Sequence, residues 1–409
     1  MWLRRVFYFY KKEGAILSIQ KNIKLYYFYS TFAELLILGP VLVLFLTAKG
    51  LTFTEIMLLQ SISSISVFFF EVPTGAIADK LGRKYSILIG AFLWAVGLLL
   101  YVVGKGFFVF ALSEITFSLG SAFKSGADSA LIYDSLKMLN REKEYQKVEG
   151  KARSYSLYAQ AIGSVLSSFL YEKNINLPMI VSILFMLITI AVTFMFKEPE
   201  VEGKEGKYGA NYFSQIKESG KYILSHDKLK AIVFFSMIFF IFYRTGFWYY
   251  QPYMEGVNIP VKYFGAIFFI FNITAAFISK RSSYIMEKTK PKTLTFMSSL
   301  MIISFLMLGT IRVWPGVFAI LLQQVSRGIY RPVTTKYLNK HIPSDKRATI
   351  LSFQSLATNL AVAAAFPLMG ILKDHSDIFT THLILTAAML ILTLISIKYM
   401  NGKLGVRKS

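Results

Sequence analysis

The residues best suited to chemistry are charged side chains that lie inside long apolar runs. Glu34, Lys124, Asp128 and Arg244 each occupy such a run. If the runs lie in hydrocarbon, each charge costs about 2.5–3.5 kcal/mol near the bilayer centre, so it needs a partner, a polar cavity or a ligand. These four residues are therefore the main candidates for binding a proton or a charged ligand.

Glu34 lies in the segment Tyr29-Ser-Thr-Phe-Ala-Glu-Leu-Leu-Ile, and we expect it near the midplane of a membrane-spanning helix. No basic residue lies one helical turn away from it. One interpretation is a cavity-facing carboxylate that carries a proton or neutralises a cationic ligand. The other is a hydrogen-bonded residue that packs two helices together.

Lys124 and Asp128 are four residues apart, so in a continuous helix they lie one turn apart and neutralise each other. That pair is either structural, or an ion pair that a proton or a ligand breaks. Glu114 lies in the same apolar segment and is a further candidate for proton binding.

Polar residues follow one face of the segment 53–78. The stripe recurs at three- and four-residue spacing, which places its members on one face of a helix: Gln60, Ser63, Ser64, Val67, Glu71 and Thr74. Gln60 is a candidate for lining a cavity. Glu71 belongs either to a polar path through the protein or to a structural network near the loop that follows.

The second half of the chain places two arginines, Arg244 and Arg327, inside apolar runs. A guanidinium group stays charged, so each needs a carboxylate, a carbonyl oxygen or an anionic ligand. Neutral polar and aromatic residues near the same depth are expected to line a cavity with Arg327: Asn272, Asn359, Tyr243 and Trp248.

The composition predicts an all-helical membrane protein. The 409 residues are 55% hydrophobic and only 17% charged, whereas soluble domains carry about 25% charged residues. A helix needs about 20 residues to cross a hydrocarbon core about 30 Å thick, and helices are the element that suits runs of this length. We expect twelve spans, at approximately 24–48, 53–78, 85–104, 107–136, 152–171, 178–196, 229–254, 261–281, 294–311, 314–336, 348–371 and 378–399.

The basic residues predict the topology. The net charge of +22 does not indicate nucleic-acid binding, because Lys and Arg fall in short runs between apolar segments. With both termini inside, the outer loops hold only Lys49, Lys105, Lys173, Lys262, Arg312 and Lys373. We predict a basic cytoplasmic segment at 1–21, a six-helix bundle at 22–196, a cytoplasmic linker with a surface helix at 197–228, a second six-helix bundle at 229–400 and a basic cytoplasmic tail at 401–409.

A short basic loop joins the second and third expected spans. It reads Gly75-Ala-Ile-Ala-Asp79-Lys-Leu-Gly82-Arg83-Lys84, with small residues, one acid and three cations at fixed offsets. We expect Gly75 to permit close helix approach and Gly82 to permit a sharp turn. The pattern Gly-x-x-x-Asp-x-x-Gly-Arg-Lys resembles the signature loop of the major facilitator superfamily, whose members have twelve transmembrane helices in two pseudo-symmetric six-helix bundles.

The resemblance implies a conformational latch at the inner face. Arg83 is expected to pair with Asp134, and Asp79 to meet the N-terminal end of the eleventh helix, where the helix dipole favours an acid. The corresponding loop of the second half, around 279–288, keeps the cations but lacks the Asp-x-x-Gly-Arg order. We therefore expect the first half to carry most of the latch.

The resemblance also implies a secondary transporter that works by alternating access, not an enzyme. Proton-coupled efflux of a small amphipathic compound is the leading hypothesis; uptake or exchange of a metabolite, such as an anion, is the second. A membrane sensor or lipid-handling protein that pumps no solute is a third, of another class. We expect a monomer in the lipid bilayer of a bacterial inner membrane, with small-molecule and proton partners, no nucleic acid, no cofactor and no metal.

Overall fold

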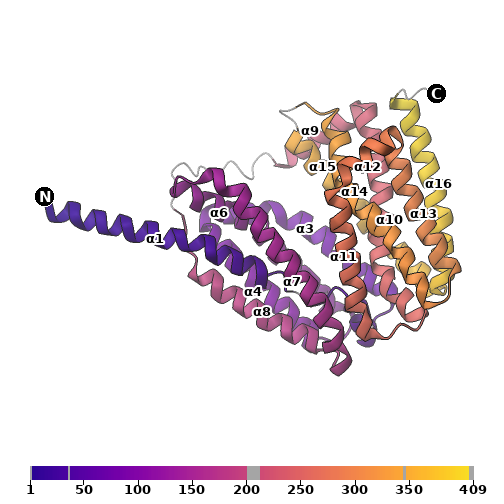
Figure 1. Ribbon diagram of the computed structural model, residues 1–409, viewed down its shortest axis with the longest axis horizontal. Coiled ribbons are helices and arrows are strands. Elements are labelled where there is room, and N and C mark those ends of the chain that lie inside the picture. Colours follow the sequence, from indigo (N-terminus) through magenta and orange to yellow (C-terminus); the bar gives the residue numbers. More distant parts are fainter. Residues whose placement is uncertain (1, 36, 200–211, 344–346, 405–409) are drawn as a thin grey trace. The chain divides into compact units, whose positions relative to one another are not determined.

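The computed structural model describes residues 2–35, 37–199, 212–343 and 347–404, and every regular element in those ranges is helical (Figure 1). Residue contacts divide the chain into two compact units. Unit 1 combines residues 1–39 with 66–210, and unit 2 combines 40–65 with 211–409. The outer part of the second span therefore groups with the second unit, although the sequence assigns it to the first bundle.

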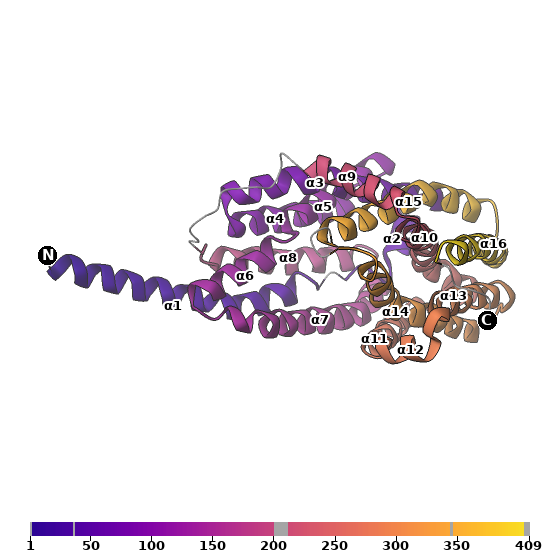
Figure 2. The same ribbon diagram turned by 90° about the horizontal axis from the view of Figure 1, so that it is seen from above.

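Unit 1 is built from helices that pack along their length. Both views show α7 alongside α1, and α4 packs on α5 and α8 (Figures 1 and 2). One helix, α3 (Phe53–Leu81), begins in unit 2 and ends in unit 1. The others are α1 (Trp2–Phe32), α4 (Arg83–Val103), α5 (Phe107–Lys124), α6 (Ala127–Met138), the short η1 (Glu142–Glu144), α7 (Tyr145–Lys173) and α8 (Leu177–Met195).

Unit 2 holds the remaining elements. The predicted linker contains a helix, α9 (Tyr212–Ser225), which packs against α15 and α10; its position at the membrane surface stays a prediction. Ile223 of α9 is buried in an apolar cluster with Leu229, Ile232 and Ile350. The elements are α2 (Leu42–Ala48), α9, α10 (Asp227–Gly256), η2 (Val261–Tyr263), α11 (Phe264–Lys280), α12 (Ser282–Thr289), η3 (Lys290–Lys292), α13 (Thr293–Thr310), η4 (Trp314–Ala319), α14 (Ile320–Asn339), α15 (Arg347–Asp374) and α16 (Ile378–Leu404).

Within the residues that the structure describes, the twelve predicted spans correspond to six helical segments in each half of the chain. Among the described residues, nine segments are long and apolar enough to cross a membrane by length and composition alone. The other three are α1, α7 and α14, which carry more charged and polar residues. These three helices also supply many of the polar side chains discussed below.

The first predicted span is not one continuous helix. α1 ends at Phe32, residues 33–41 are not helical where they are described, and α2 starts at Leu42. Pro40 explains part of this break, because it has no backbone N–H and disfavours helical geometry at the residue before it. Glu34 consequently lies in a turn just after α1, and the expectation of a mid-helix position was wrong.

The fourth predicted span is also broken. α5 ends at Lys124 and α6 starts at Ala127, with Gly126 at a φ of 72° between them. Glycine adopts this left-handed conformation without the steric cost that a Cβ brings. The break reorients the chain between Lys124 and Asp128, so these residues do not sit on consecutive turns of one helix.

The crossing of α4 and α5 depends on two facing glycines. A Cβ added to Gly90 would lie 2.7 Å from the carbonyl oxygen of Gly120, and one added to Gly120 would lie 2.8 Å from that of Gly90. Glycines at a helix crossing let the two backbones approach closely, which strengthens dispersion contacts in a membrane. This crossing holds α5 against α4 one turn before Lys124.

Asp374, the last residue of α15, caps the N-terminus of α3 within unit 2. Its carboxylate accepts hydrogen bonds from the backbone N–H groups of Phe53 at 3.0 Å and Thr54 at 2.8 Å, and from the Thr54 hydroxyl at 2.6 Å. A carboxylate satisfies the unpaired N–H groups of a first helical turn and complements the positive end of the helix dipole.

We expect Asp374→Ala to lower the free energy of unfolding by about 0.5–2 kcal/mol, the usual cost of losing an N-terminal cap. Asp374→Asn keeps one carbonyl acceptor and is expected to lose less. Thermal unfolding of the purified protein in detergent measures both effects. Equal melting temperatures for the wild type and Asp374→Ala would show that the cap contributes nothing.

Candidate functional site

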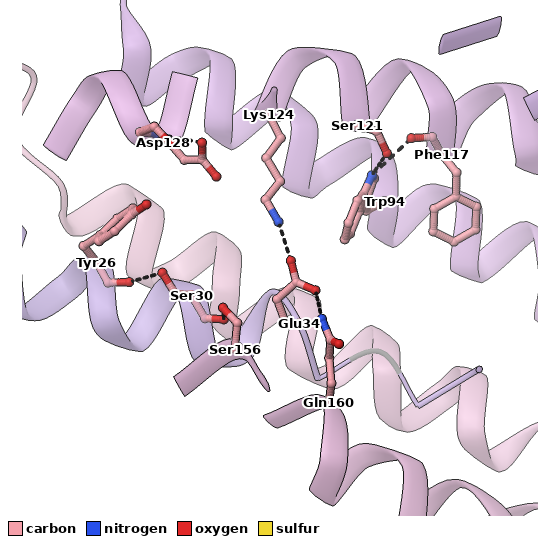
Figure 3. A network of polar contacts seen from close by, with 11 residues as sticks. Tyr26, Ser30, Glu34, Trp94, Phe117, Ser121, Lys124, Asp128, Ser156 and Gln160 are labelled. Atoms are coloured by element: carbon pink, nitrogen blue, oxygen red, sulfur yellow. Dashed lines mark hydrogen bonds and ion pairs between the residues drawn. The ribbon is translucent and has the colours of Figure 1, made fainter. Parts of the chain in front are cut away.

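Glu34 and Lys124 form an ion pair in unit 1. Lys124 Nζ lies 3.3 Å from Glu34 Oε1, and the two side chains are only 18% and 26% exposed. Gln160 of α7 donates a hydrogen bond from Nε2 to the other carboxylate oxygen, Oε2, at 2.8 Å (Figure 3). The carboxylate is thus held from two sides, by a cation on α5 and an amide on α7.

Aromatic rings hold the Lys124 ammonium group in place. Lys124 Nζ lies 4.9 Å from the ring centroid of Trp94 and 5.6 Å from that of Tyr29. Trp94 is oriented by its indole N–H, which donates to the carbonyl of Phe117 and the hydroxyl of Ser121, both at 3.1 Å (Figure 3). Cation–π attraction at desolvated positions is worth up to about 2 kcal/mol, so Lys124 keeps favourable contacts even without its carboxylate.

A small polar cavity of about 80 Å³ lies beside the ion pair. Asp128, in the first turn of α6, accepts a hydrogen bond at Oδ1 from the backbone N–H of Ser129 at 2.7 Å. The Tyr26 hydroxyl donates to Glu149 Oε2 at 2.8 Å. The cavity is lined by Tyr26, Tyr29, Ser30, Glu34, Lys124, Asp128, Glu149, Ala152, Arg153 and Ser156.

The structure changes the partner predicted for Lys124. Its ion pair is with Glu34 on another segment, not with Asp128, because the chain breaks at Gly126 between the two. Asp128 nevertheless lies near enough to Lys124 for the two charges to attract each other. One ammonium group therefore stands near two carboxylates.

Several residues of this site were not predicted, above all Gln160 and Glu149. A signal for them does exist in the sequence. Glu149, Arg153, Ser156 and Gln160 are spaced by four, three and four residues, which puts them on one face of α7. The polar stripe was missed because the predicted span begins at residue 152, after Glu149, and because Gln160 carries no charge that would single it out.

Other predicted residues of unit 1 lie in different surroundings. Glu114 is buried and accepts a hydrogen bond from the Tyr101 hydroxyl, which joins α4 to α5 away from the cavity. Glu71 is exposed near the inner part of α3, whereas Gln60, in the part of α3 that belongs to unit 2, is 8% exposed. None of the three lines the cavity beside Lys124.

In unit 2, Arg327 is held by neutral partners. Its Nη1 donates to Asn272 Oδ1 at 3.0 Å and to Gln324 Oε1 at 3.2 Å. Arg244 is half-buried and close enough to Arg327 to be repelled by its charge. Tyr243 stacks near Tyr330, whereas Trp248 is buried; Asn359 is exposed and donates to the Ser355 carbonyl of its own helix.

The signature loop makes the predicted turn and one contact that was not foreseen. Gly82 has a φ of 100°, as a sharp turn requires. Glu198, just after the sixth span, accepts hydrogen bonds from the backbone N–H groups of Arg83 at 2.8 Å and Lys84 at 2.7 Å, so it caps α4. A Cβ at Gly75 would meet no described atom within 4 Å, and the close helix approach expected there stays a prediction.

The latch that the resemblance implies stays a prediction. The side chain of Asp79 lies outside the described residues, so its proposed contact with the eleventh spanning helix is not tested. Asp134 is half-buried in α6, and its pairing with Arg83 is not tested either.

The comparisons with known proteins agree with this helical architecture. The sequence profile of the Major Facilitator Superfamily matches residues 25–321 and 233–404. An uncharacterized MFS-type transporter of Bacillus subtilis (strain 168), YxaM, is 26% identical over 328 residues, which cover 78% of this chain and 80% of that protein. Quinolone resistance protein NorA of Staphylococcus aureus (strain MRSA252) is 22% identical over 333 residues, covering 78% and 81%.

A solved structure shows the same fold. The crystal structure of the nucleoside transporter NupG superposes with a TM-score of 0.76 at 12% identity and covers 94% of this chain and 98% of that one. The fold is that of a multi-pass helical membrane transporter. The chain belongs to the Major Facilitator Superfamily, whose members carry small molecules across membranes.

Proposed function

We propose that this transporter exports a small amphipathic compound in exchange for protons, and that Glu34 is the group that binds the proton. The observation that carries the proposal is the ion pair between Glu34 and Lys124, 3.3 Å apart at a break in a spanning segment. A half-buried carboxylate is a suitable proton carrier, because its protonation removes a charge that the membrane interior disfavours.

Protonation would release the lysine. A neutral Glu34 carboxylic acid no longer attracts Lys124 by charge, although Gln160 can still donate to its carbonyl oxygen. The ammonium group then has Asp128 nearby and the rings of Trp94 and Tyr29 around it. Binding and release of one proton therefore moves a positive charge between two carboxylates, and such a local change can bias a transporter between two states.

The class of substrate is supported by the relatives and by the aromatic surroundings. NorA is named for quinolone resistance, which is the behaviour expected of a protein that exports drug-like compounds. The half-buried ring of Trp94 adds aromatic surface beside the ion pair, and such surface suits amphipathic ligands. The asymmetry of basic loops supports cytoplasmic termini, and we propose that the chain acts as a monomer in the bilayer.

The test uses wild-type protein in liposomes that contain a pH-sensitive dye. A panel of fluorescent amphipathic compounds is supplied under an imposed pH gradient, and compound and proton movements are followed together. We expect at least one compound to move against its gradient and to speed the collapse of the pH gradient. Compound movement without linked proton movement would reject the coupling, and movement of neither would favour the sensor or lipid-handling alternative.

A further inference from the structure

The spanning helices of unit 2 carry positive charge without acids to balance it. Arg244 lies in the middle of α10 and Arg327 in α14. The acidic residues of α10, α11, α13, α14, α15 and α16 are Asp227, Glu255 and Asp374, each within two residues of a helix end. The two arginines therefore share a region of unit 2 that has no neutralising carboxylate of its own.

The guanidinium groups have free donors. Within the described residues, Arg244 makes no side-chain hydrogen bond or ion pair, and Arg327 bonds only through Nη1. An arginine has five N–H donors in a planar fork that fits a carboxylate or phosphate by two parallel bonds. Two such groups near each other repel, and an anion placed between them removes that repulsion.

Arg327 is held in position by a buried chain of amides and hydroxyls. Gln324, which accepts from Arg327, donates from Nε2 to the Tyr250 hydroxyl at 2.9 Å. Tyr250 donates to Gln323 Oε1 at 3.1 Å, and Gln323 donates to the Ser304 hydroxyl at 3.0 Å. A network in which every member has a partner fixes the orientation of a polar group. The network leaves the charge of Arg327 uncompensated, which suits a binding role better than a structural one.

Stacked aromatic rings lie next to Arg244 along α10. The ring of Tyr330 on α14 lies 5.6 Å from that of Phe240 and 6.2 Å from that of Tyr243, with interplanar angles of 20° and 25°. All three rings are only partly buried. Such a group offers flat apolar surface beside the positive charge.

We infer that unit 2 binds the negatively charged group of a soluble organic anion at Arg244 and Arg327, with an aromatic part of the ligand against Tyr243 and Tyr330. The inference rests on the proposed transport function. It restricts the amphipathic substrate to compounds that carry a carboxylate, phosphate or similar negatively charged group. In this proposal, Glu34 of the ion pair in unit 1 binds the proton, and the arginines of unit 2 bind the anion.

Equilibrium binding tests the inference without a pH gradient. The melting temperature of the purified full chain in a neutral detergent is measured with 1-naphthoate and with 1-naphthylmethylammonium, which has the same rings and the opposite charge. Naphthoate is expected to raise the melting temperature in a saturable way, and the cation is not. Arg244→Gln and Arg327→Gln are each expected to weaken naphthoate binding about tenfold or more, because each removes charged hydrogen bonds.

Two controls separate binding from folding. Arg331→Gln, at an exposed arginine one turn further along α14, is expected to leave naphthoate binding unchanged. Arg244→Gln is expected to raise the melting temperature of the ligand-free protein, because it removes an unpaired charge. A variant that is more stable and yet no longer binds naphthoate cannot be explained by misfolding.

Three results would overturn the inference: an equal naphthoate response in wild type and Arg244→Gln, an equal or larger response to the cation, or a response to phosphatidylglycerol micelles with none to naphthoate. The last result would assign the arginines to a lipid headgroup. If the protein binds naphthoate as expected but moves no compound across a membrane, the proposed transport function fails and the anion site stands.

Discussion

Glu34→Gln will abolish the response of transport to a pH gradient while it preserves exchange of substrate for substrate. The amide has nearly the shape of the protonated acid and cannot release a proton, so the site stays in its protonated form. Its carbonyl can still accept the hydrogen bond from Gln160, whereas the charge attraction to Lys124 is lost. We expect gradient-driven transport in proteoliposomes to slow on the order of tenfold or more. A tenfold change corresponds to a loss of about 1.4 kcal/mol in the free-energy difference that favours one state of the transporter over the other.

Glu142→Gln provides the matched control, because Glu142 is an exposed carboxylate in the loop before α7. It removes the same charge from the chain without touching the cavity, and its transport should follow the wild type at every pH gradient. If the Glu34→Gln protein still responded fully to the pH gradient, Glu34 would have no role in coupling transport to the proton. Asp128 would then be the carboxylate to test next.

The sequence predicted the helical spans and the turn at Gly82 because these depend on local properties. Hydrocarbon leaves a backbone no partner outside its own helix, so long apolar runs become helices whatever their neighbours are. A positive φ is likewise a local requirement, and Gly82 at 100° meets it. The linker helix at 212–225 was recognisable from its amphipathic spacing for the same reason.

Which side chains pair with each other in the site depends on tertiary structure, and here the sequence spacing predicted the wrong ion pair. The i,i+4 rule pairs Lys124 with Asp128 only if the helix continues through Gly126, and it does not. The actual partner, Glu34, is 90 residues away and lies in a turn that the hydropathy profile does not reveal. Glu198 was missed in a similar way, because a linker acid gains its capping role only when the chain brings it to α4.

The crossing of α4 and α5 links the fold to the site. A Cβ at Gly120 would lie 2.5 Å from Trp94 Cδ1 and 2.8 Å from the Gly90 carbonyl oxygen. The backbone oxygen cannot move away unless the two helices separate. The Trp94 ring cannot move away unless its hydrogen bonds to Phe117 and Ser121 break. A methyl group added at this position therefore disturbs both the packing and the ring that lies beside Lys124.

We expect Gly120→Ala to lower the free energy of unfolding by about 1–3 kcal/mol, the usual cost of overpacking. In an unconstrained helix, replacing glycine by alanine normally stabilises the protein by about 0.5–1 kcal/mol. At position 120 the close crossing of the two helices is expected to turn this gain into a loss of stability. Gly150→Ala in α7 is the matched control, since a Cβ there meets no atom of the described residues within 4 Å and its effect should be neutral or stabilising. Melting temperatures in detergent compare the two variants. If Gly120→Ala melted with or above the wild type, the close approach of α4 and α5 would not be a constraint, and the placement of Lys124 would need another cause.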